Sequence, residues 1–224
     1  MNILLVAATS FELAPTEEWL RSQFQEIGNY RFKKDHLEVQ LLVTGVGLSF
    51  TTYSLTKALT STASYDLVIN AGIAGALNPD LALGDVVQVA SEVFADLGVE
   101  EANGQFISVH DLDLVSPNQF PFSEGKLLNP VQDNTFLPAV EGISVNKVHG
   151  YPPSIQALKA KYAADIESME GASFFYVCLL EQVHFLEIRS ISNYVEARNR
   201  EHWNIPLAIN NLNEVLVKML GALV

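Results

Sequence analysis

The order of strand-like and helix-like segments is the feature of this sequence that most constrains its fold. Residues 2–8 form a continuous apolar run of strand length, and the sequence P-T-E-E at residues 15–18 is typical of a helix start. A second strand is predicted at residues 37–44, a helix at residues 49–59 and a short apolar strand at residues 66–70. Because strands that alternate with helices usually run parallel, this order predicts an α/β protein with a mostly parallel sheet covered on both faces.

The second half of the chain is less regular. Residues 84–95 are rich in strand formers, but the stretch from there to about residue 138 includes S-P-N-Q-F-P-F-S-E-G and is predicted to be a long surface loop. Such a loop can be a lid, an interface element or a plain insertion. Further strands are predicted at residues 142–148, 164–168 and 184–192, and helices after Pro153 and at residues 171–181 and 206–223. No repeat, linker or change of composition divides the chain, so we expect one domain over residues 1–224.

Composition indicates a compact globular protein and excludes some partners. Hydrophobic residues make up 49% of the 224 residues and charged residues 17%, as in chains that fold by themselves. The formal net charge of −13 would repel a polyphosphate backbone, so nucleic acid is not an expected partner. An anionic small molecule would need a locally basic pocket, for which the candidates are Arg189, Arg198, Arg200 and Lys147.

The termini and the cysteine give no sign of export or of a membrane span. Cys178, the single cysteine, lies in the apolar run A-S-F-F-Y-V-C-L-L and is predicted to be a small buried side chain. The N-terminus M-N-I-L-L-V-A-A lacks the basic residues of a signal peptide, and no apolar run approaches the ~20 residues of a membrane span. We therefore expect a cytoplasmic protein without a membrane partner.

Two glycine motifs follow predicted strands. Gly45-Val46-Gly47 and Gly72-Ile73-Ala74-Gly75 are predicted to be turns at the carboxyl ends of strands, where open α/β sheets bind ligands. Neither is a dinucleotide fingerprint or a Walker loop, and a tight strand-to-helix turn is the simpler explanation of each. Ile73 offers a hydrocarbon side chain where a phosphate-binding loop would present a hydroxyl or a cation.

Polar residues at three other strand ends are candidates for a binding site. Glu12 follows the first strand, and Met169-Glu170 stands between a short strand and a nearly all-apolar helix. Either carboxylate could simply complement a helix N-terminus, but Glu170 could also accept hydrogen bonds from vicinal hydroxyls while Met169 packs on a sugar. The run I-R-S-I-S-N-Y at residues 188–194 ends a buried strand in more polar groups than a strand end needs.

The motifs T-S-F-E, N-A-G-I-A-G, G-D-V-V, S-M-E-G-A and R-S-I-S-N, in this order, resemble those of the nucleoside phosphorylase and nucleosidase superfamily. The resemblance covers nearly the whole chain and is weakest at residues 97–138. It implies a single-domain phosphorylase/hydrolase-like fold, with a twisted mixed β-sheet flanked by α-helices, that assembles as a homodimer or larger homo-oligomer. It also implies cleavage of the N-glycosidic bond of a purine nucleoside, with no metal and no organic cofactor.

The resemblance assigns roles to individual positions. Glu12 matches the carboxylate that activates water, Met169 and Glu170 match the pair that binds ribose, and Asn193 occupies the acid position beside the purine. Arg189 and Ser192 match residues that shape the same corner, and Gly72 and Ile73 belong to the substrate-binding loop.

The sequence departs from this pattern at two positions. Nucleosidases for methylthioadenosine carry Ser or Thr where this chain has Ile73, and Asp where it has Asn193. The first departure disfavours a phosphorylase, because that hydroxyl helps to hold phosphate. The second favours hypoxanthine as the base, because a carboxamide can accept a hydrogen bond from a protonated ring nitrogen while it donates one to a 6-oxo group.

Several alternatives remain open at the level of sequence. The chain could be a methylthioadenosine nucleosidase, a phosphate-dependent purine nucleoside phosphorylase or a nucleoside-binding sensor without activity. If the substrate carries an aryl carboxylate, Arg198, Arg200 and Lys147 are candidates to bind it, although each is also typical of a solvated surface. Aromatic residues around residues 149–151 are candidates to line the base or aryl pocket, although aromatic residues more often pack in the core.

Overall fold

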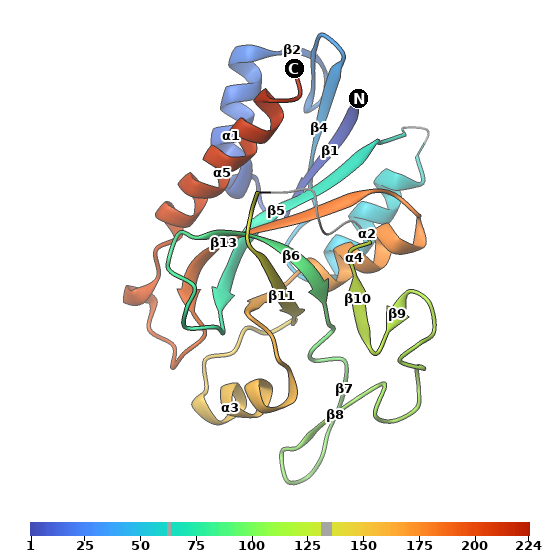
Figure 1. The fold of residues 1–224 in the computed structure, drawn as a ribbon, viewed down its shortest axis with the longest axis vertical. Helices are drawn as coiled ribbons and strands as arrows, with labels where there is room; N and C mark the ends of the chain where they lie inside the picture. Colours follow the sequence, from blue (N-terminus) through green and yellow to red (C-terminus); the bar gives the residue numbers. More distant parts are fainter. Residues whose placement is uncertain (62–63, 131–135) are drawn as a thin grey trace.

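The computed structural model describes residues 1–61, 64–130 and 136–224. Most strands in this part of the chain form one mixed sheet (Figure 1). Its order is β2 (Gln25–Gly28), β3 (Arg31–Lys34), β4 (Leu37–Val43), β1 (Asn2–Ala7), β5 (Leu67–Ala76), β12 (Ile166–Ser168), β11 (Ala139–Ser144), β6 (Val86–Glu92), β10 (Lys126–Leu128) and β9 (Phe122–Ser123), with β13 (Phe185–Tyr194) pairing both β5 and β6.

Helices cover this sheet in two pairs. Helices α1 (Ser10–Gln23) and α5 (Ile205–Gly221) lie side by side, and α2 (Leu48–Leu59) packs beside α4 (Gly171–Leu180) (Figure 1). The remaining elements are α3 (Pro152–Lys161), the 3-10 helix η1 (Arg200–His202) and the separate hairpin of β7 (Gly98–Glu100) and β8 (Phe106–Ser108). The predicted α/β class, with a mixed sheet flanked by helices, is confirmed. Within the described residues, no helix is both long and apolar enough to cross a membrane.

Five strands of the sheet form a closed circuit. Strand β5 is parallel to β1 over its first half, antiparallel to β12 at its end, and parallel to β13 along its whole length. Strand β13 is also antiparallel to β6, which connects through β11 back to β12. The register of β5 and β13 places Gly72 beside Arg189 and Gly75 beside Asn193, so two motifs about 120 residues apart in sequence become neighbours.

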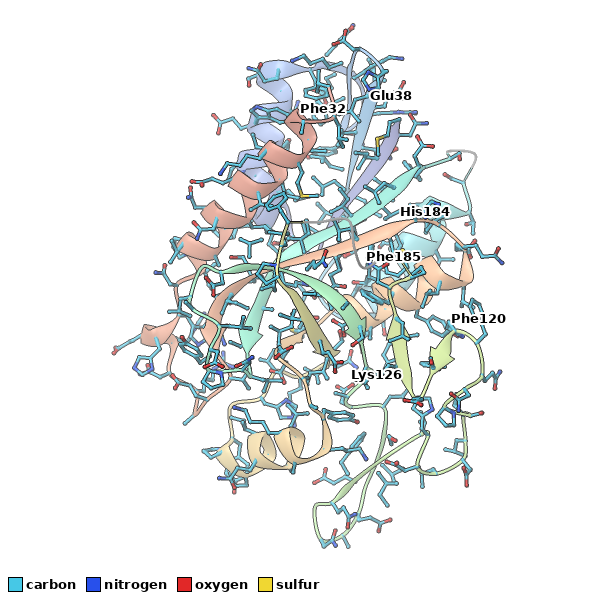
Figure 2. All side chains as sticks on the ribbon, viewed as in Figure 1. Phe32, Glu38, Phe120, Lys126, His184 and Phe185 are labelled. Atoms are coloured by element: carbon cyan, nitrogen blue, oxygen red, sulfur yellow. The ribbon has the colours of Figure 1, made fainter. Side chains whose placement is uncertain are left out.

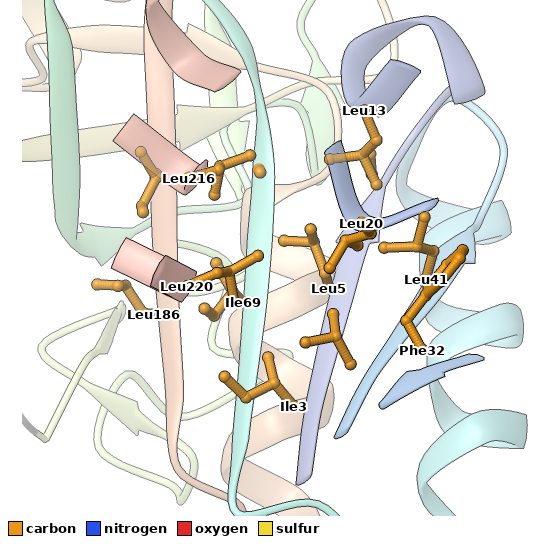
Figure 3. Packing of buried hydrophobic residues seen from close by; sticks show 14 of the residues in the cluster. Ile3, Leu5, Leu13, Leu20, Phe32, Leu41, Ile69, Leu186, Leu216 and Leu220 are labelled. Carbon is orange, nitrogen blue, oxygen red and sulfur yellow. The ribbon is translucent and has the colours of Figure 1, made fainter. Parts of the chain in front are cut away.

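The two larger of the three hydrophobic clusters pack against the helix pairs that cover the sheet. On the side of α1 and α5, large aliphatic side chains from both helices pack on the strands (Figure 3). They include Leu13, Leu20, Leu216 and Leu220 from the helices and Ile3, Leu5, Ile69 and Leu186 from the strands. Full burial of one such side chain stabilises the fold by ~1.5–3 kcal/mol.

The second cluster lies beneath α4, where aromatic rings pack edge to face. Phe185, labelled in Figure 2, has its ring centroid 5.6 Å from that of Phe174 and 4.8 Å from that of Phe175. Cys178 is fully buried in this cluster, which confirms its prediction as a small apolar side chain, and burial raises the pKa of its thiol. Helix α4 is apolar on nearly all sides because it packs against α2 as well as against the strands of the sheet.

Three predictions about local structure were wrong. The motif A-G-I-A-G is not a turn, because β5 continues through it to Ala76. Helix α1 begins at Ser10 and not near Pro15, which lies inside the helix. The irregular stretch up to residue 138 contains four short strands, β7 to β10, although its residues 131–135 lie outside the described part. The helix boundary was misjudged because Thr9 and Glu12 cap the helix upstream of the proline.

Candidate active site

Glu12 is fixed by three hydrogen-bond donors at the start of α1. Its Oε2 accepts from the backbone nitrogen and the hydroxyl of Thr9, both at 2.9 Å, and its Oε1 lies 3.2 Å from the donating backbone nitrogen of Ile73. The residue is 7% exposed. The capping arrangement that starts the helix thus also sets the direction of this carboxylate, and Ile73 contributes its backbone rather than its side chain.

Glu170 stands at the N-cap of α4, directly after Met169, which is half-buried. Its Oε1 accepts from the backbone nitrogen of Gly47 at 3.0 Å. Gly45 and Gly47 have φ of +92° and +102°, so the predicted glycine turn is confirmed here, and it aims an amide at the carboxylate. Burial raises the pKa of Glu170, against the opposing effect of the nearby Arg189 charge.

Arg189 is fully buried next to both carboxylates. Its Nε donates to Oε1 of Glu187 at 2.8 Å, and its Nη1 lies 3.9 Å from Oε2 of Glu170. A Cβ on Gly72 would lie 2.0 Å from Nη1 of Arg189 and 3.0 Å from Oε1 of Glu12, so the guanidinium and this carboxylate meet over the glycine. Burial by itself would lower the pKa of Arg189, but the charges of Glu187 and Glu170 raise it.

The side chains of Arg189 and Glu12 pass close over Gly72, which explains why the strand segment A-G-I-A-G contains glycine. A larger residue at position 72 would collide with the guanidinium, and Gly75 likewise has Asn193 Nδ2 3.0 Å from the position of a Cβ. The glycines therefore make room for side chains from the neighbouring strand and are not needed for a turn.

Asn193 and Ser192 form a second group, farther along β13. The Ser192 hydroxyl lies 2.8 Å from Oδ1 of Asn193 and 3.2 Å from the carbonyl oxygen of Ala74, and Nδ2 of Asn193 donates to the carbonyl of Tyr194 at 3.0 Å. Asn193 lines a pocket together with other residues from the ends of the strands and the loops that follow them. These residues are Gly75, Val148, His149, Glu167, Tyr194, Glu196, Arg198, Asn199 and Trp203.

Arg189 and Asn193 lie at separate positions along β13. They are four positions apart along β13, or about 13 Å at the rise of an extended strand. Arg189 pairs with Gly72 and Asn193 with Gly75. The site therefore has two ends: Glu12, Glu170 and Arg189 at one, and Asn193 with its pocket at the other.

Sequence reasoning missed a buried carboxyl pair beneath the first end. A Cβ on Gly171 would lie 2.1 Å from Oε1 of Glu92 and 2.6 Å from Oε1 of Glu187, so the two carboxyl groups face each other there. Glu92 also accepts from the Ser144 hydroxyl at 2.9 Å. Burial raises the pKa of both carboxyls, and the charge of Glu187 further raises that of Glu92. Arg189 opposes this rise in the pKa of Glu187 through both its charge and its hydrogen bond, whereas the two largest influences on Glu92, burial and the charge of Glu187, both raise its pKa. A lone Glu inside the apolar run V-V-Q-V-A-S-E was the available signal.

An open groove of about 1040 Å³ is lined by α2, by α4 and by the loops that follow β6 and β11. Its lining includes Leu48, next to Gly47, and Ser173, on the first turn of α4. Aromatic side chains and one lysine continue it outward, namely Tyr53, Phe94, Tyr176 and Lys57.

The cations expected to bind an aryl carboxylate lie elsewhere. Arg198 is at the pocket of Asn193, with its guanidinium 5.6 Å from the centre of the Trp203 ring, and Arg200 is 5.9 Å from the same ring. Lys147 is exposed in the loop that follows β11. Within the described residues, no group of three or more His, Cys, Asp or Glu side chains is placed to hold a metal ion.

Fold and geometry together define a class of protein: an α/β enzyme with two buried carboxylates, Glu12 and Glu170, and a polar pocket at the ends of its strands. The chain belongs to the phosphorylase superfamily, because the model of the family described as "Phosphorylase superfamily" matches residues 2–221.

Known relatives narrow the class further. The chain is 31% identical to a futalosine hydrolase of Thermus thermophilus over 67% of both proteins, and 28% identical to a 5′-methylthioadenosine/S-adenosylhomocysteine nucleosidase of Aeromonas salmonicida over the full length of both. The native structure of futalosine hydrolase from Helicobacter pylori shares the fold, with a TM-score of 0.79, 18% identity and coverage of 99% of this chain and 98% of that one. The protein is thus an N-glycosyl hydrolase with nucleosidase activity.

Proposed function

We propose that this enzyme hydrolyses the N-glycosidic bond of futalosine, releasing hypoxanthine and dehypoxanthine futalosine, as a step of the futalosine pathway of menaquinone biosynthesis. The observation that carries the proposal is the carboxamide of Asn193 in the pocket at the end of β13. A carboxamide can donate to a 6-oxo group and accept from a ring N–H, as hypoxanthine requires. The identity to the Thermus futalosine hydrolase supports the same substrate.

The sugar would occupy the first end of the site. Oε2 of Glu170 has no hydrogen-bond donor among the described residues and can accept from the ribose hydroxyls, while Met169 packs against the ring. Glu12 orients water and takes a proton from it. As the glycosidic bond breaks, positive charge develops on the ribose between these two carboxylates, which lowers the barrier.

Water is a better acceptor than phosphate for this geometry. The only cation near Glu12 and Glu170 among the described residues is Arg189, which is fully buried and already offset by Glu187. Position 73 supplies no hydroxyl. A dianionic phosphate would therefore meet three carboxylates and one shared guanidinium, an unfavourable balance of charge.

The acyl-aryl tail of futalosine fits the groove between α2 and α4. Tyr53, Phe94 and Tyr176 offer aromatic faces to its ring, and Lys57 offers a cation to its carboxylate. Tyr53 and Phe50 on α2 are 69% and 64% exposed. These exposed rings support a homodimer or larger homo-oligomer as part of the proposal, since large apolar side chains gathered on a surface are typical of interfaces.

Product analysis with futalosine, aminodeoxyfutalosine and methylthioadenosine, each with and without phosphate, tests this function. We expect futalosine to be cleaved fastest, with hypoxanthine released at a rate that phosphate does not change. Glu12→Gln should lower kcat by about 10²–10⁴-fold on every substrate that is cleaved. Asn193→Asp should shift the preference towards the adenine substrates.

Other outcomes would contradict the proposal. Equal cleavage of futalosine and the two adenine compounds would refute the role given to Asn193. A sugar phosphate as product would identify a phosphorylase. Binding of nucleosides without release of free base would identify a sensor.

A further inference from the structure

The pocket that contains Asn193 also contains a histidine held by a buried carboxylate. Nδ1 of His149 is hydrogen-bonded to Oε2 of Glu167, and the backbone nitrogen of His149 donates to Oε1 of the same residue at 3.0 Å. Both residues line the pocket with Asn193. The side chains of His149 and Glu167 are 15% and 3% exposed, so the pair is largely shielded from solvent.

This arrangement commits both oxygens of Glu167 to a single residue. One oxygen fixes the backbone of the loop after β11 and the other fixes the ring, so His149 has one orientation. Nε2 of His149 has no hydrogen-bond partner among the described residues. A carboxylate on one ring nitrogen with the other nitrogen free is the arrangement in which an imidazole transfers protons.

The proposed reaction has a need that Asn193 does not meet. The electrons of the C1′–N9 bond leave with hypoxanthine, and protonation of the base makes it a better leaving group. A carboxamide cannot readily give up a proton, whereas an imidazolium can.

We propose that His149, oriented by Glu167, is the acid that delivers a proton to N7 of the departing purine, and that Asn193 then accepts a hydrogen bond from that N7–H. This inference rests on the proposed function, because His149 would protonate a base that otherwise leaves with a negative charge.

The atoms of the step balance. The C1′–N9 electron pair passes to the purine, Nε2 of the imidazolium gives its proton to N7, and the base leaves as neutral hypoxanthine. The oxygen of water bonds to C1′ and its proton passes to Glu12. Exchange with solvent then returns a proton to His149 and removes one from Glu12.

No other titratable group of this pocket is placed as well. Glu196 is 44% exposed and bonds Nδ1 of His202 at 2.6 Å, and the Arg198 guanidinium, always charged, lies over the Trp203 ring. No carboxylate among the described residues forms a hydrogen bond with the Tyr194 hydroxyl, whereas Glu167 holds the His149 ring. Only His149 combines a shielded position with a carboxylate partner.

A substrate that needs no proton separates this role from a structural one. N7-methylated futalosine already carries a positive charge on its base, so its glycosidic bond can break without an acid. For His149→Asn we expect kcat on futalosine to fall by at least about 100-fold, with KM within a few-fold, and kcat on the N7-methyl compound to fall by less than about 5-fold. Glu167→Gln should show the same selectivity with a smaller loss, because it acts through His149.

Two control variants complete the experiment. His202→Asn makes the same change in an exposed histidine nearby and should leave both rates unchanged, whereas Glu12→Gln should reduce both. Equal losses on the two substrates in His149→Asn would overturn the inference. So would the finding that neither His149→Asn nor Glu167→Gln loses more activity on futalosine than on the N7-methyl compound. If the wild type releases no hypoxanthine from futalosine, the proposed function itself fails, and that result is visible before any variant is made.

Discussion

At the scale of single residues, the protein buries three ionisable groups under its active site. Glu92, Glu187 and Arg189 are each 0% exposed. Removing such charges from water is costly, and their mutual attraction offsets the cost only when the charges balance. The Glu187 carboxylate offsets the Arg189 guanidinium, and burial together with the charge of Glu187 favours the protonated form of Glu92.

This protonation makes stability depend on pH. Because the pKa of folded Glu92 is raised, the native state keeps a proton that the unfolded chain loses above its ordinary pKa of 4.5. The free energy of unfolding should therefore fall as pH rises from about 4.5 towards the raised pKa, by up to about 1.4 kcal/mol per pH unit. Glu92→Gln keeps the shape and a donor but cannot ionise, so relative to wild type it should gain stability as pH rises.

Thermal unfolding between pH 5 and 8 would measure this difference. Glu38, labelled in Figure 2, provides a control of opposite sign, because Lys33 and Arg31 lower the pKa of its carboxyl. Its stabilisation is present above pH 4.5 and is lost as pH falls through the lowered pKa, so Glu38→Gln should lose stability at neutral pH. If the Tm of Glu92→Gln changed with pH in parallel with that of wild type, the folded protein would not raise the pKa of Glu92.

Single residues also show where reasoning from sequence ends. Glu12 and Glu170 could be proposed as site residues because each stands at the end of a predicted strand, where a ligand site is expected. The pair of Glu92 and Glu187 could not be proposed from sequence. Their contact depends on the register of β13 and β6, and on Gly171, which has no side chain to keep them apart. Nothing in the sequence indicated that Arg189 lies beside Glu12 and Glu170, because that proximity depends on the pairing of β13 with β5.

At the scale of elements, the backbone hydrogen bonding of α1 is irregular near Pro15, and a side chain from α5 takes part in it. Pro15 cannot donate a backbone hydrogen bond and its ring crowds the preceding turn. Next to it, the amide of Asn213 on α5 accepts from the backbone nitrogen of Thr16 at 3.0 Å and donates to the carbonyl of Glu12 at 2.9 Å. These are two groups that a regular α-helix joins directly. A side chain from α5 thus takes part in the backbone of the helix that carries Glu12.

We expect Asn213→Leu to damage both stability and catalysis. The change keeps the size of the side chain but leaves buried backbone groups without their partner, which costs about 1–3 kcal/mol. The same loss loosens the turn that carries Glu12, so kcat should fall more than KM rises. Asn210→Leu is the matched control, because the exposed Asn210 side chain bonds Glu214 alone among the described residues. It should change stability by less than about 0.5 kcal/mol.

Chemical denaturation and steady-state kinetics would measure both effects. Unchanged kcat in a destabilised Asn213→Leu would mean that the contact holds the two helices together without affecting Glu12. The contact itself was not predictable, because a proline near a predicted helix start gave no reason to seek a partner 200 residues away. Hydrophobic periodicity made elements such as α5 and β13 predictable. The full length of β5 was not predictable, because its glycines look like a turn but make room for side chains of β13.

At the scale of the whole molecule, charge is unevenly balanced. The net charge of −13 is spread over a surface on which acidic groups outnumber basic ones, so the folded chain repels itself. Salt screens such repulsion. Raising NaCl from about 20 to about 300 mM should therefore increase Tm, by about 2–4 °C if about 1 kcal/mol is recovered.

Differential scanning fluorimetry with NaCl and, at equal osmolarity, sorbitol would check this. The uncharged osmolyte also stabilises, but not through screening, so the rise in salt should be the larger and should level off once the screening length is short. A Tm that is flat or falls with salt would indicate that local ion pairs, such as that of Lys126 with Glu141, outweigh the net repulsion.

The contact of Asn213 with α1 also has a consequence for the order in which the enzyme is made. Asn213 is translated 201 residues after Glu12. The turn that carries Glu12 therefore waits for a side chain that leaves the ribosome much later. Strands β1, β4 and β5 can pair early, but this turn is complete only when α5 has been translated and has docked on α1.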